Sequence, residues 1–182
     1  MEDERKNLIV LFPGAGYTVN RPLLYYAGFK YYVKGYESIK INYGDCLKKE
    51  KSFPDIIQDT QSYVLNQIKD VDFSSYDDIL FVSKSFGTAI AGGIAEKLDK
   101  KNIRHIYLTP IGESLKFIKS GKNINIVITG TKDRFLETNI LKEHCEQEKI
   151  RLELIDDADH SLEIFGDMNV NIEILKRVVE LY

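Results

Sequence analysis

Three residue types that can cooperate in nucleophilic catalysis each follow a separate predicted strand: Ser85, Asp133 and His160. A serine hydroxyl is a poor nucleophile at neutral pH, but a neutral imidazole within hydrogen-bond reach can take its proton as the bond to carbon forms. A carboxylate on the second ring nitrogen fixes the imidazole tautomer and stabilises the imidazolium. If the fold brings these side chains together, we expect chemistry on an ester-like bond, with the serine attacking the carbonyl carbon.

Ser85 lies between a predicted buried strand that ends at Val82 and a predicted helix that begins near Phe86. A serine at such a junction sits on a tight, strained turn that lifts its hydroxyl above the sheet. The strand and the helix nearly touch there, so small residues are needed two positions before and after the serine. Gly87 meets this need, and Ser83 is small enough to be tolerated. The alternative interpretation is that Ser85 only caps the helix N-terminus, which is a common position for serine.

Asp133 and His160 each come just after the carboxyl end of a later predicted strand. Ligands and catalytic groups gather outside these ends in open α/β sheets. Asp133 follows the strand at 124–129, and its alternative role is to cap a helix that starts near Phe135. His160 follows the last strand, at 151–155. If Asp133 is not the partner of the imidazole, the remaining acidic candidates are Asp157, Asp159 and Glu137.

The other two of the three histidines are placed less favourably for catalysis. His105 lies inside the predicted strand 103–108, where we expect a core or sheet position. His144 lies in a predicted helix rich in charged residues, so we expect its ring to be solvated. His160 therefore remains the candidate base.

The attacked carbonyl becomes an oxyanion, which must be met by fixed N–H donors. The Gly-rich segment 13–18 follows the first predicted strand and can turn its amides inward, and the N–H of Phe86 begins the helix after the serine. Such a loop could instead hold phosphate. However, Gly14-Ala15-Gly16 lacks the third glycine of a dinucleotide fingerprint, and no Gly-Lys-Ser/Thr follows it. Candidate pocket residues near strand ends, each of which could equally pack the loops, are Tyr17, Tyr43, Lys84, Pro110 and Ile111.

The elements that must position these residues alternate along the chain. Short apolar runs predict strands, and the two near Ile39 and Leu152 alternate in polarity, as expected at sheet edges. Strands are predicted at 8–12, 38–43, 78–82, 103–108, 124–129 and 151–155. Helices are predicted at 22–33, from Ser52 through Ile68, at 86–98, 135–149 and 162–181, with a shorter one at 111–120. This order predicts an α/β fold with a mostly parallel sheet of about six strands and helices on both faces.

The bulk properties exclude several classes of function. A length of 182 residues suits one domain spanning 1–182, with short loops and little room for a lid. The net charge of −3, with acids and bases mixed along the chain, does not favour a nucleic acid partner. The two cysteines lie far apart with no CxxC or Cys/His cluster, so we expect free thiols, no metal and no cofactor. The acidic N-terminus and the absence of a long apolar run predict a cytoplasmic protein without a membrane span.

Taken together, these residues resemble the α/β-hydrolase superfamily over nearly the whole chain. The order of serine, aspartate and histidine is the one expected of that fold. The resemblance implies that Ser85 is the nucleophile, Asp133 the acid of the triad and His160 the base. It also implies that Ala15 and Phe86 are the oxyanion donors; Gly16 is a further candidate, which we place with Tyr17 at the substrate. The segments that carry the resemblance are Phe12-Pro13-Gly14-Ala15-Gly16, Ser83-Lys84-Ser85-Phe86-Gly87, Gly130-Thr131-Lys132-Asp133 and Ala158-Asp159-His160-Ser161.

Two positions depart from the pattern of the superfamily. Pro13 stands where many members have histidine, and Ser83 stands where glycine is more usual. The chain is similar to the short members without a lid, which include carboxylesterases, thioesterases and dienelactone-type hydrolases. We therefore expect a serine hydrolase that acts on a small-molecule acyl substrate through an acyl-enzyme. A carboxylic ester is the preferred substrate class, and a thioester is the second candidate. The alternative, motivated by the altered nucleophile turn, is a non-catalytic protein of this fold that serves as a binding or scaffold module.

Overall fold

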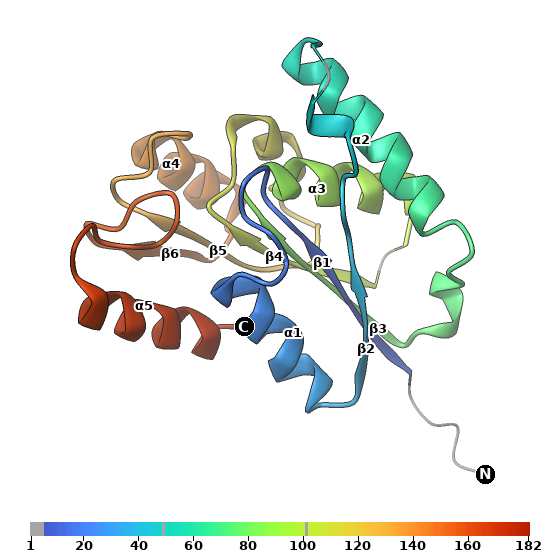
Figure 1. The fold of residues 1–182 in the computed structure, drawn as a ribbon, viewed down its shortest axis with the longest axis horizontal. Helices are drawn as coiled ribbons and strands as arrows, with labels where there is room; N and C mark the ends of the chain where they lie inside the picture. Colours follow the sequence, from blue (N-terminus) through green and yellow to red (C-terminus); the bar gives the residue numbers. More distant parts are fainter. Residues whose placement is uncertain (1–5, 49, 101) are drawn as a thin grey trace.

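The computed structural model describes residues 6–48, 50–100 and 102–182, which form a six-stranded parallel sheet with helices on both faces (Figure 1). The predicted α/β architecture is confirmed. The strands are β1 (Asn7–Phe12), β2 (Tyr36–Lys40), β3 (Asp78–Lys84), β4 (Ile103–Leu108), β5 (Ile124–Gly130) and β6 (Leu152–Ile155). The helices are α1 (Pro22–Tyr32), α2 (Phe53–Gln67), α3 (Phe86–Leu98), α4 (Thr138–Glu148) and α5 (Met168–Glu180), with a 3-10 helix η3 (Gly112–Phe117). Among the described residues, no helix has both the length and the apolar character needed to cross a lipid bilayer.

The sheet has buried central strands and partly exposed edges. Its strand order is β2-β1-β3-β4-β5-β6. Residues 8–12 of β1 and 79–84 of β3 are all buried, because helices cover both faces of these strands. β2 and β6 form the two edges and keep exposed or half-exposed side chains, so the edge positions predicted from their alternating polarity are confirmed.

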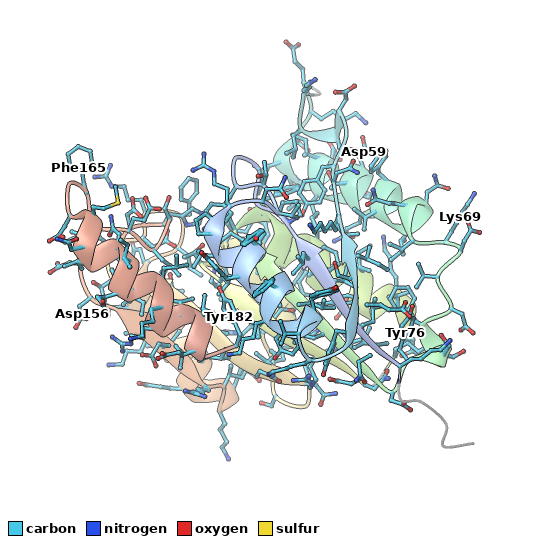
Figure 2. The ribbon with its side chains drawn as sticks, turned by 60° about the horizontal axis from the view of Figure 1, so that its bottom comes forward. Asp59, Lys69, Tyr76, Asp156, Phe165 and Tyr182 are labelled. Carbon is cyan, nitrogen blue, oxygen red and sulfur yellow. The ribbon has the colours of Figure 1, made fainter. Side chains whose placement is uncertain are left out.

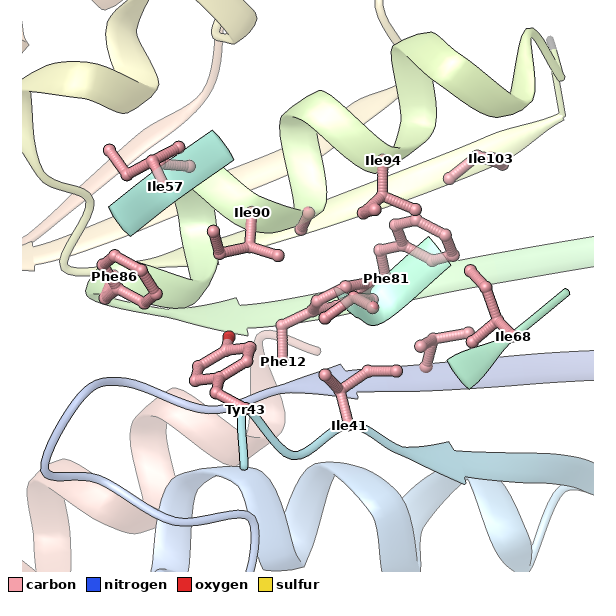
Figure 3. Packing of buried hydrophobic residues seen from close by; sticks show 14 of the residues in the cluster. Phe12, Ile41, Tyr43, Ile57, Ile68, Phe81, Phe86, Ile90, Ile94 and Ile103 are labelled. Carbon is pink, nitrogen blue, oxygen red and sulfur yellow. The ribbon is translucent and has the colours of Figure 1, made fainter. Parts of the chain in front are cut away.

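One face of the sheet is covered by α2, α3 and α4, and the other by α1 and α5 (Figure 1). Figure 3 shows Ile90 and Ile94 of α3 packed over Phe12 and Phe81, which lie on β1 and β3. The rings of Phe12 and Phe81 are in contact, with centroids 4.9 Å apart. This packing fixes α3 against the two central strands and so fixes the position of its N-terminus.

On the second face, the C-terminal helix α5 lies against α1. Val178 of α5 is fully buried in the cluster that α1 shares. The hydroxyl of Tyr182 donates to the carbonyl oxygen of Leu23 at 3.1 Å, and Figure 2 shows Tyr182 at the end of α5 beside α1. Lys30 Nζ donates to the carbonyl oxygen of Val179 at 2.7 Å. These bonds hold α5 along α1, on the face opposite α3.

The helix predicted at 135–149 begins later than expected, at Thr138. The N–H of Phe135 donates to Oδ1 of Asp133 at 2.9 Å, which holds the chain in a turn before the helix starts. The predicted helix start was wrong because this side-chain bond competes with helical hydrogen bonding. Asp133 therefore does cap local backbone, as its alternative role proposed, but it does so one turn before α4.

The helix predicted at 162–181 also begins later, at Met168. Leu162 has a φ of 60°, in the left-handed region that a helix cannot include. Asp167 is the true N-cap, and its Oδ1 accepts a hydrogen bond from the N–H of Val170 at 3.0 Å. The apolar periodicity of the sequence continues through this loop, so it predicted a helix where the chain forms a loop.

Two further boundaries differ from the predictions. The shorter helix predicted at 111–120 is present as the 3-10 helix η3, which spans only Gly112–Phe117. The strand predicted at 38–43 is shifted, because β2 pairs with β1 from Tyr36 to Lys40. The next residue, Ile41, still donates to the carbonyl oxygen of Leu11 at 3.0 Å before the chain leaves the sheet.

The strand order creates a topological switch point between β1 and β3. The chain moves outward from β1 to the edge strand β2 and then returns to the other side of β1 to form β3. The crossovers thus diverge at the carboxyl ends of β1 and β3, which is where open α/β sheets bind their ligands. The Gly-rich segment 13–18 leaves β1 at this point, and Ser85 follows β3.

Candidate active site

Ser85 lies at the sharp turn between β3 and α3. Its backbone has φ 54° and ψ −124°, a strained conformation that residues with side chains rarely adopt. The N–H of Ser85 donates to the carbonyl oxygen of Leu108 at 2.9 Å, which anchors the turn to β4. Although Ser85 occupies the N-cap position of α3, its side chain makes no capping hydrogen bond within the described part of the chain. Its Oγ instead lies 2.7 Å from Nε2 of His160.

The turn is tight because the loop after β1 touches the start of α3. A Cβ added at Gly87 would lie 2.4 Å from the carbonyl oxygen of Pro13 and 2.6 Å from that of Phe12. Two residues before Ser85, Ser83 is fully buried, and its hydroxyl donates to the carbonyl oxygen of Ile106 at 3.4 Å. The position of Ser83, where glycine is more usual, thus accommodates a serine side chain. The position of Gly87 has no room for any side chain.

We expect Gly87→Ala to lower the free energy of unfolding by about 1–3 kcal/mol, because the new methyl group would press on two backbone oxygens. Urea unfolding of the two proteins measures this loss. Gly16→Ala is the matched control, since no described atom outside Gly16 and its two chain neighbours lies within 4 Å of the Cβ it would add. We expect the control to remain within about 0.5 kcal/mol of wild type. Equal stability of the two variants would contradict the close contact.

His160 bridges Ser85 and Asp133. Its Nδ1 lies 2.7 Å from Oδ2 of Asp133, so both ring nitrogens are engaged. The imidazole keeps 20% of its surface exposed, whereas the Asp133 side chain has none. The hydroxyl of Thr129 donates to the same Oδ2 at 3.2 Å, and the N–H of Phe135 occupies Oδ1. The carboxylate is therefore held in place from three sides.

The hydrogen bonds around Asp133 set its charge. Burial alone would raise the pKa of this carboxyl, but the bonds from His160, Phe135 and Thr129 hold its pKa below the usual value. An ionised carboxylate facing Nδ1 requires a proton on that nitrogen, and we assign this tautomer. Nε2 is then the acceptor that faces Ser85 Oγ, which is the arrangement needed to remove the hydroxyl proton.

The loops after β5 and β6, which carry the acid and the imidazole, are tied together through their main chains. The N–H of Lys132 donates to the carbonyl oxygen of Ala158 at 3.0 Å, and the N–H of Asp157 donates to the hydroxyl of Thr131 at 2.8 Å. A Cβ at Gly130 would lie 2.1 Å from the oxygen of Ala158. The two loops therefore form one unit, and the separation of the carboxylate from the imidazole is fixed by backbone contacts.

The loop after β1 lies against Ser85. A Cβ at Gly14 would be 3.2 Å from Cβ of Ser85. The N–H of Gly14 donates to the carbonyl oxygen of Tyr17 at 2.9 Å and closes a turn whose tip is formed by Ala15 and Gly16, both exposed. The base of this turn, at Gly14, therefore lies beside the strained serine.

The start of α3 supplies the second face of this region. Phe86 is the first residue of α3, so its N–H precedes the ladder of intrahelical hydrogen bonds. Its ring packs edge-on against Tyr43, with centroids 5.4 Å apart, and the Tyr43 hydroxyl donates to the carbonyl oxygen of Pro13 at 2.7 Å. Tyr17 is half-buried, and its hydroxyl accepts a hydrogen bond from the N–H of Leu23 at 3.0 Å. Both tyrosines thus hold loops at the site.

The family model described as an alpha/beta hydrolase domain matches residues 5–175 of the sequence. The chain belongs to the alpha/beta hydrolase family. The resemblance to that superfamily is therefore confirmed. No curated protein matches this sequence.

Solved structures with the same fold include proteins described as hydrolases and esterases. One is an alpha-beta serine hydrolase homologue from Coxiella burnetii, with 16% identity, a TM-score of 0.63, and coverage of 96% of this chain and 84% of that one. An esterase from Pyrococcus furiosus has 15% identity, a TM-score of 0.64, and coverage of 99% and 83%. Est1E from Butyrivibrio proteoclasticus has 12% identity, a TM-score of 0.64, and coverage of 98% and 89%. At such identities, the likeness concerns the fold.

The other carboxylates considered as partners of the imidazole have other contacts or lie exposed. Asp157 forms a salt bridge with Lys132 at 2.8 Å. Oδ1 of Asp159 accepts a hydrogen bond from the N–H of Ser161 at 2.7 Å. Glu137 is exposed at the N-terminus of α4. The structure thus brings Asp133, and none of these three, against Nδ1 of the imidazole.

Of the predictions for the other two histidines, the one for His105 is correct and the one for His144 is wrong. His105 is 5% exposed and stacks on Tyr107, so its predicted core position is confirmed. His144 is half-buried rather than solvated, and its Nε2 lies 2.6 Å from the carbonyl oxygen of Ile118. The charged residues around it in sequence face solvent, while this ring turns toward the segment that follows η3. Among the described residues, no three histidine, cysteine or acidic side chains gather as metal ligands.

Two residues of the site were missed by sequence reasoning. Thr129, which donates to Asp133, is a polar residue at the end of an apolar strand, and that position could have indicated it. Phe135 remains 66% exposed while its ring lies 4.2 Å from the ring of His160, between centroids. No sequence signal marks Phe135, because its contact depends on the turn that delays α4.

Proposed function

We propose that this alpha/beta hydrolase is a serine hydrolase that cleaves a carboxylic ester. The observation that carries the proposal is the unbroken chain of hydrogen bonds from Ser85 Oγ through both ring nitrogens of His160 to Asp133, each 2.7 Å long. These lengths suit proton transfer. The three groups come from loops after β3, β5 and β6, and the strained turn at Ser85 has no capping role that would explain its conformation.

In the acylation step, Ser85 Oγ attacks the carbonyl carbon of the ester while its proton passes to Nε2 of His160. The C–O double bond opens to an oxyanion, for which the N–H groups of Ala15 and Phe86 are the proposed donors. Asp133 stabilises the imidazolium formed in this step. When the tetrahedral adduct collapses, the alkoxide leaves with the proton from Nε2, and the acyl group remains on the serine.

In the deacylation step, a water molecule takes the place of the alcohol. Nε2 of His160 accepts a proton from the water as its oxygen attacks the acyl carbon. The same oxyanion donors serve the second tetrahedral adduct. Collapse returns the proton to Ser85 Oγ and releases the carboxylic acid, which restores the enzyme.

We further propose that the substrate is a small molecule with an accessible acyl group. Gly16 and Tyr17 would border it on the β1 side, and the exposed ring of Phe135 offers an apolar surface next to the imidazole. Est1E, whose fold is similar, has been determined with ferulic acid bound, which is consistent with a small-molecule substrate. As a substrate class, a thioester is the second candidate after a carboxylic ester.

We propose the cytoplasm as the place of the reaction. Cys46 and Cys145 are both buried as free thiols, as is usual for cysteines in a reducing compartment. Fractionation of cells that express the protein would test this, and recovery from an oxidising compartment would contradict it.

Active-site labelling with a fluorophosphonate probe tests the proposed function. We expect the wild type to be labelled and Ser85→Ala to remain unlabelled. Ser52→Ala is the matched control, because Ser52 occupies the same N-cap position on α2 but does cap its helix. A panel of p-nitrophenyl esters of increasing acyl length then defines the preferred substrate. Absence of both labelling and turnover in the wild type would favour the non-catalytic binding module instead.

A further inference from the structure

A lysine is buried directly beside the candidate nucleophile. Lys84 is the last residue of β3, precedes Ser85 and is 1% exposed. Lysine is almost never fully buried, because removing an ammonium group from water is costly unless each of its donors finds a partner. A methionine of similar length would fill the same volume without that cost. The partners of Lys84 therefore indicate why a cation is present.

The ammonium group of Lys84 contacts three loops. It donates to the main-chain carbonyl oxygen of His160 at 2.6 Å and to the hydroxyl of Thr109. Its Nζ also lies 5.3 Å from the centroid of the Tyr17 ring, within the range of a cation–π contact. The partners follow β6, β4 and β1, and Lys84 itself ends β3. The carboxyl ends of four strands thus meet at one ammonium group.

Two of these partners are themselves strained or functional. Thr109 has a φ of 43°, which is uncommon for a β-branched residue. Its N–H donates to the carbonyl oxygen of Ile128 at 2.6 Å, so its backbone is fixed to β5. The carbonyl of His160 belongs to the residue whose ring faces the serine. His160 is therefore held at its ring by Asp133 and at its main chain by Lys84.

We propose that Lys84 is a positioning residue: its ammonium group clamps the main chain of His160 and thereby keeps Nε2 aligned with Ser85 Oγ. The inference rests on the proposed function, since this alignment affects catalysis only if the serine reacts. Lys84 does not touch the reacting atoms, and it acts through the imidazole that it positions.

The charge of Lys84 makes the clamp sensitive to pH. Burial lowers the pKa of Lys84 to about 8, against the opposing effect of the Asp133, Asp159 and Glu163 carboxylates. Burial raises the pKa of Tyr17 to about 12, so the phenol stays neutral in this range. Hydrogen bonds from a cation are stronger than those from a neutral amine, so the clamp weakens as pH rises through about 8.

Folding stability should respond to pH in the opposite direction. The ordinary pKa of lysine is 10.5, so between about 8 and 10.5 the unfolded chain binds more protons at Lys84 than the folded chain. The contribution of this group to stability therefore rises with pH across that window. A fall in activity there, without a loss of stability, would separate weakening of the clamp from unfolding.

The first test replaces Lys84 with methionine. We expect kcat to fall about 10- to 100-fold with little change in KM, because a small misplacement of the imidazole is enough for such a loss. The decline in wild-type activity above pH about 8 should be absent from the variant, while the melting temperature stays within about 4 °C of wild type. Lys30→Met is the matched control, since Lys30 also donates to main-chain carbonyls, those of Val179 and Glu180, but between α1 and α5.

The second measurement does not depend on catalysis. In hydrogen–deuterium exchange, the amides of residues 156–165 should exchange about tenfold faster in Lys84→Met than in wild type. Lys30→Met should leave these amides unchanged. If Lys84→Met matches wild type in both exchange and kcat, or if Lys30→Met reproduces its effects, the positioning role is wrong.

The proposed function and the positioning role of Lys84 can be rejected independently of each other. If fluorophosphonate does not label the wild type, the proposed function is wrong, and the exchange experiment alone decides whether Lys84 positions the His160 loop. If Lys84→Met does not fold, Thr109→Val removes one partner of the ammonium group at nearly constant shape. That variant should speed exchange in 156–165 and lower kcat a few-fold, and no change in either would overturn the proposal.

Discussion

Replacing Ser85 with alanine is expected to lower kcat by about a million-fold, and His160→Ala should do nearly the same. Such a loss corresponds to about 8 kcal/mol of transition-state stabilisation. The double variant should be little worse than either single one, because the imidazole has nothing to deprotonate once the hydroxyl is gone. Steady-state turnover of the best p-nitrophenyl ester measures all three. Independent, additive losses would contradict a single catalytic unit.

Comparison with Ser52 separates catalysis from helix capping. The side chain of Ser52 accepts a hydrogen bond from the N–H of Asp55 at 3.4 Å at the start of α2. Ser52→Ala should therefore lose about 1 kcal/mol of stability and no activity. Ser85→Ala should lose activity but keep its free energy of unfolding within about 0.5 kcal/mol of wild type, because the Ser85 side chain makes no cap bond among the described residues. Matching behaviour of the two variants would favour a capping role for Ser85.

The sequence predicted those features of the fold that depend on burial. Strand β4 has the predicted bounds, 103–108, because both faces of this apolar run are covered. The edge strands were found from alternating polarity, because their side chains remain partly exposed at the edges of the sheet. The rule that ligands gather at the carboxyl ends of parallel strands then placed Ser85, Asp133 and His160 on one side of the sheet. Their convergence to hydrogen-bond distance agrees with that placement.

Features that depend on individual polar contacts were beyond the reach of sequence patterns. The start of α4 is delayed by one bond to Asp133, and the start of α5 by the left-handed backbone of Leu162. Lys84 was considered only as a pocket residue, because its burial depends on oxygens that other strands bring to it. In each case the deciding contact depends on a local turn or on residues distant in the sequence. Contacts of these two kinds produce no periodic pattern in the sequence.

Asp133→Asn is expected to lower kcat by about 10,000-fold. Asparagine has nearly the same shape, and its carbonyl oxygen can still accept the bond from the N–H of Phe135. Its amide group, however, would present N–H to Nδ1 of His160 and so favour the tautomer that carries the proton on Nε2. That tautomer cannot accept the proton of Ser85. Measurement of kcat at neutral pH, with unfolding followed in parallel, tests this expectation.

The pH dependence of stability provides an independent check on the same carboxylate. Because the pKa of Asp133 is lower in the folded chain than its ordinary value of 3.8, the ionised form stabilises the fold above that value. This contribution is lost as pH falls through the folded pKa, so the stability difference between wild type and Asp133→Asn should narrow below pH 3.8. Asp157→Asn, which disrupts only the exposed salt bridge with Lys132, should retain wild-type kcat. Near-normal turnover by Asp133→Asn would show that this carboxylate does not orient the imidazole, whatever its effect on folding.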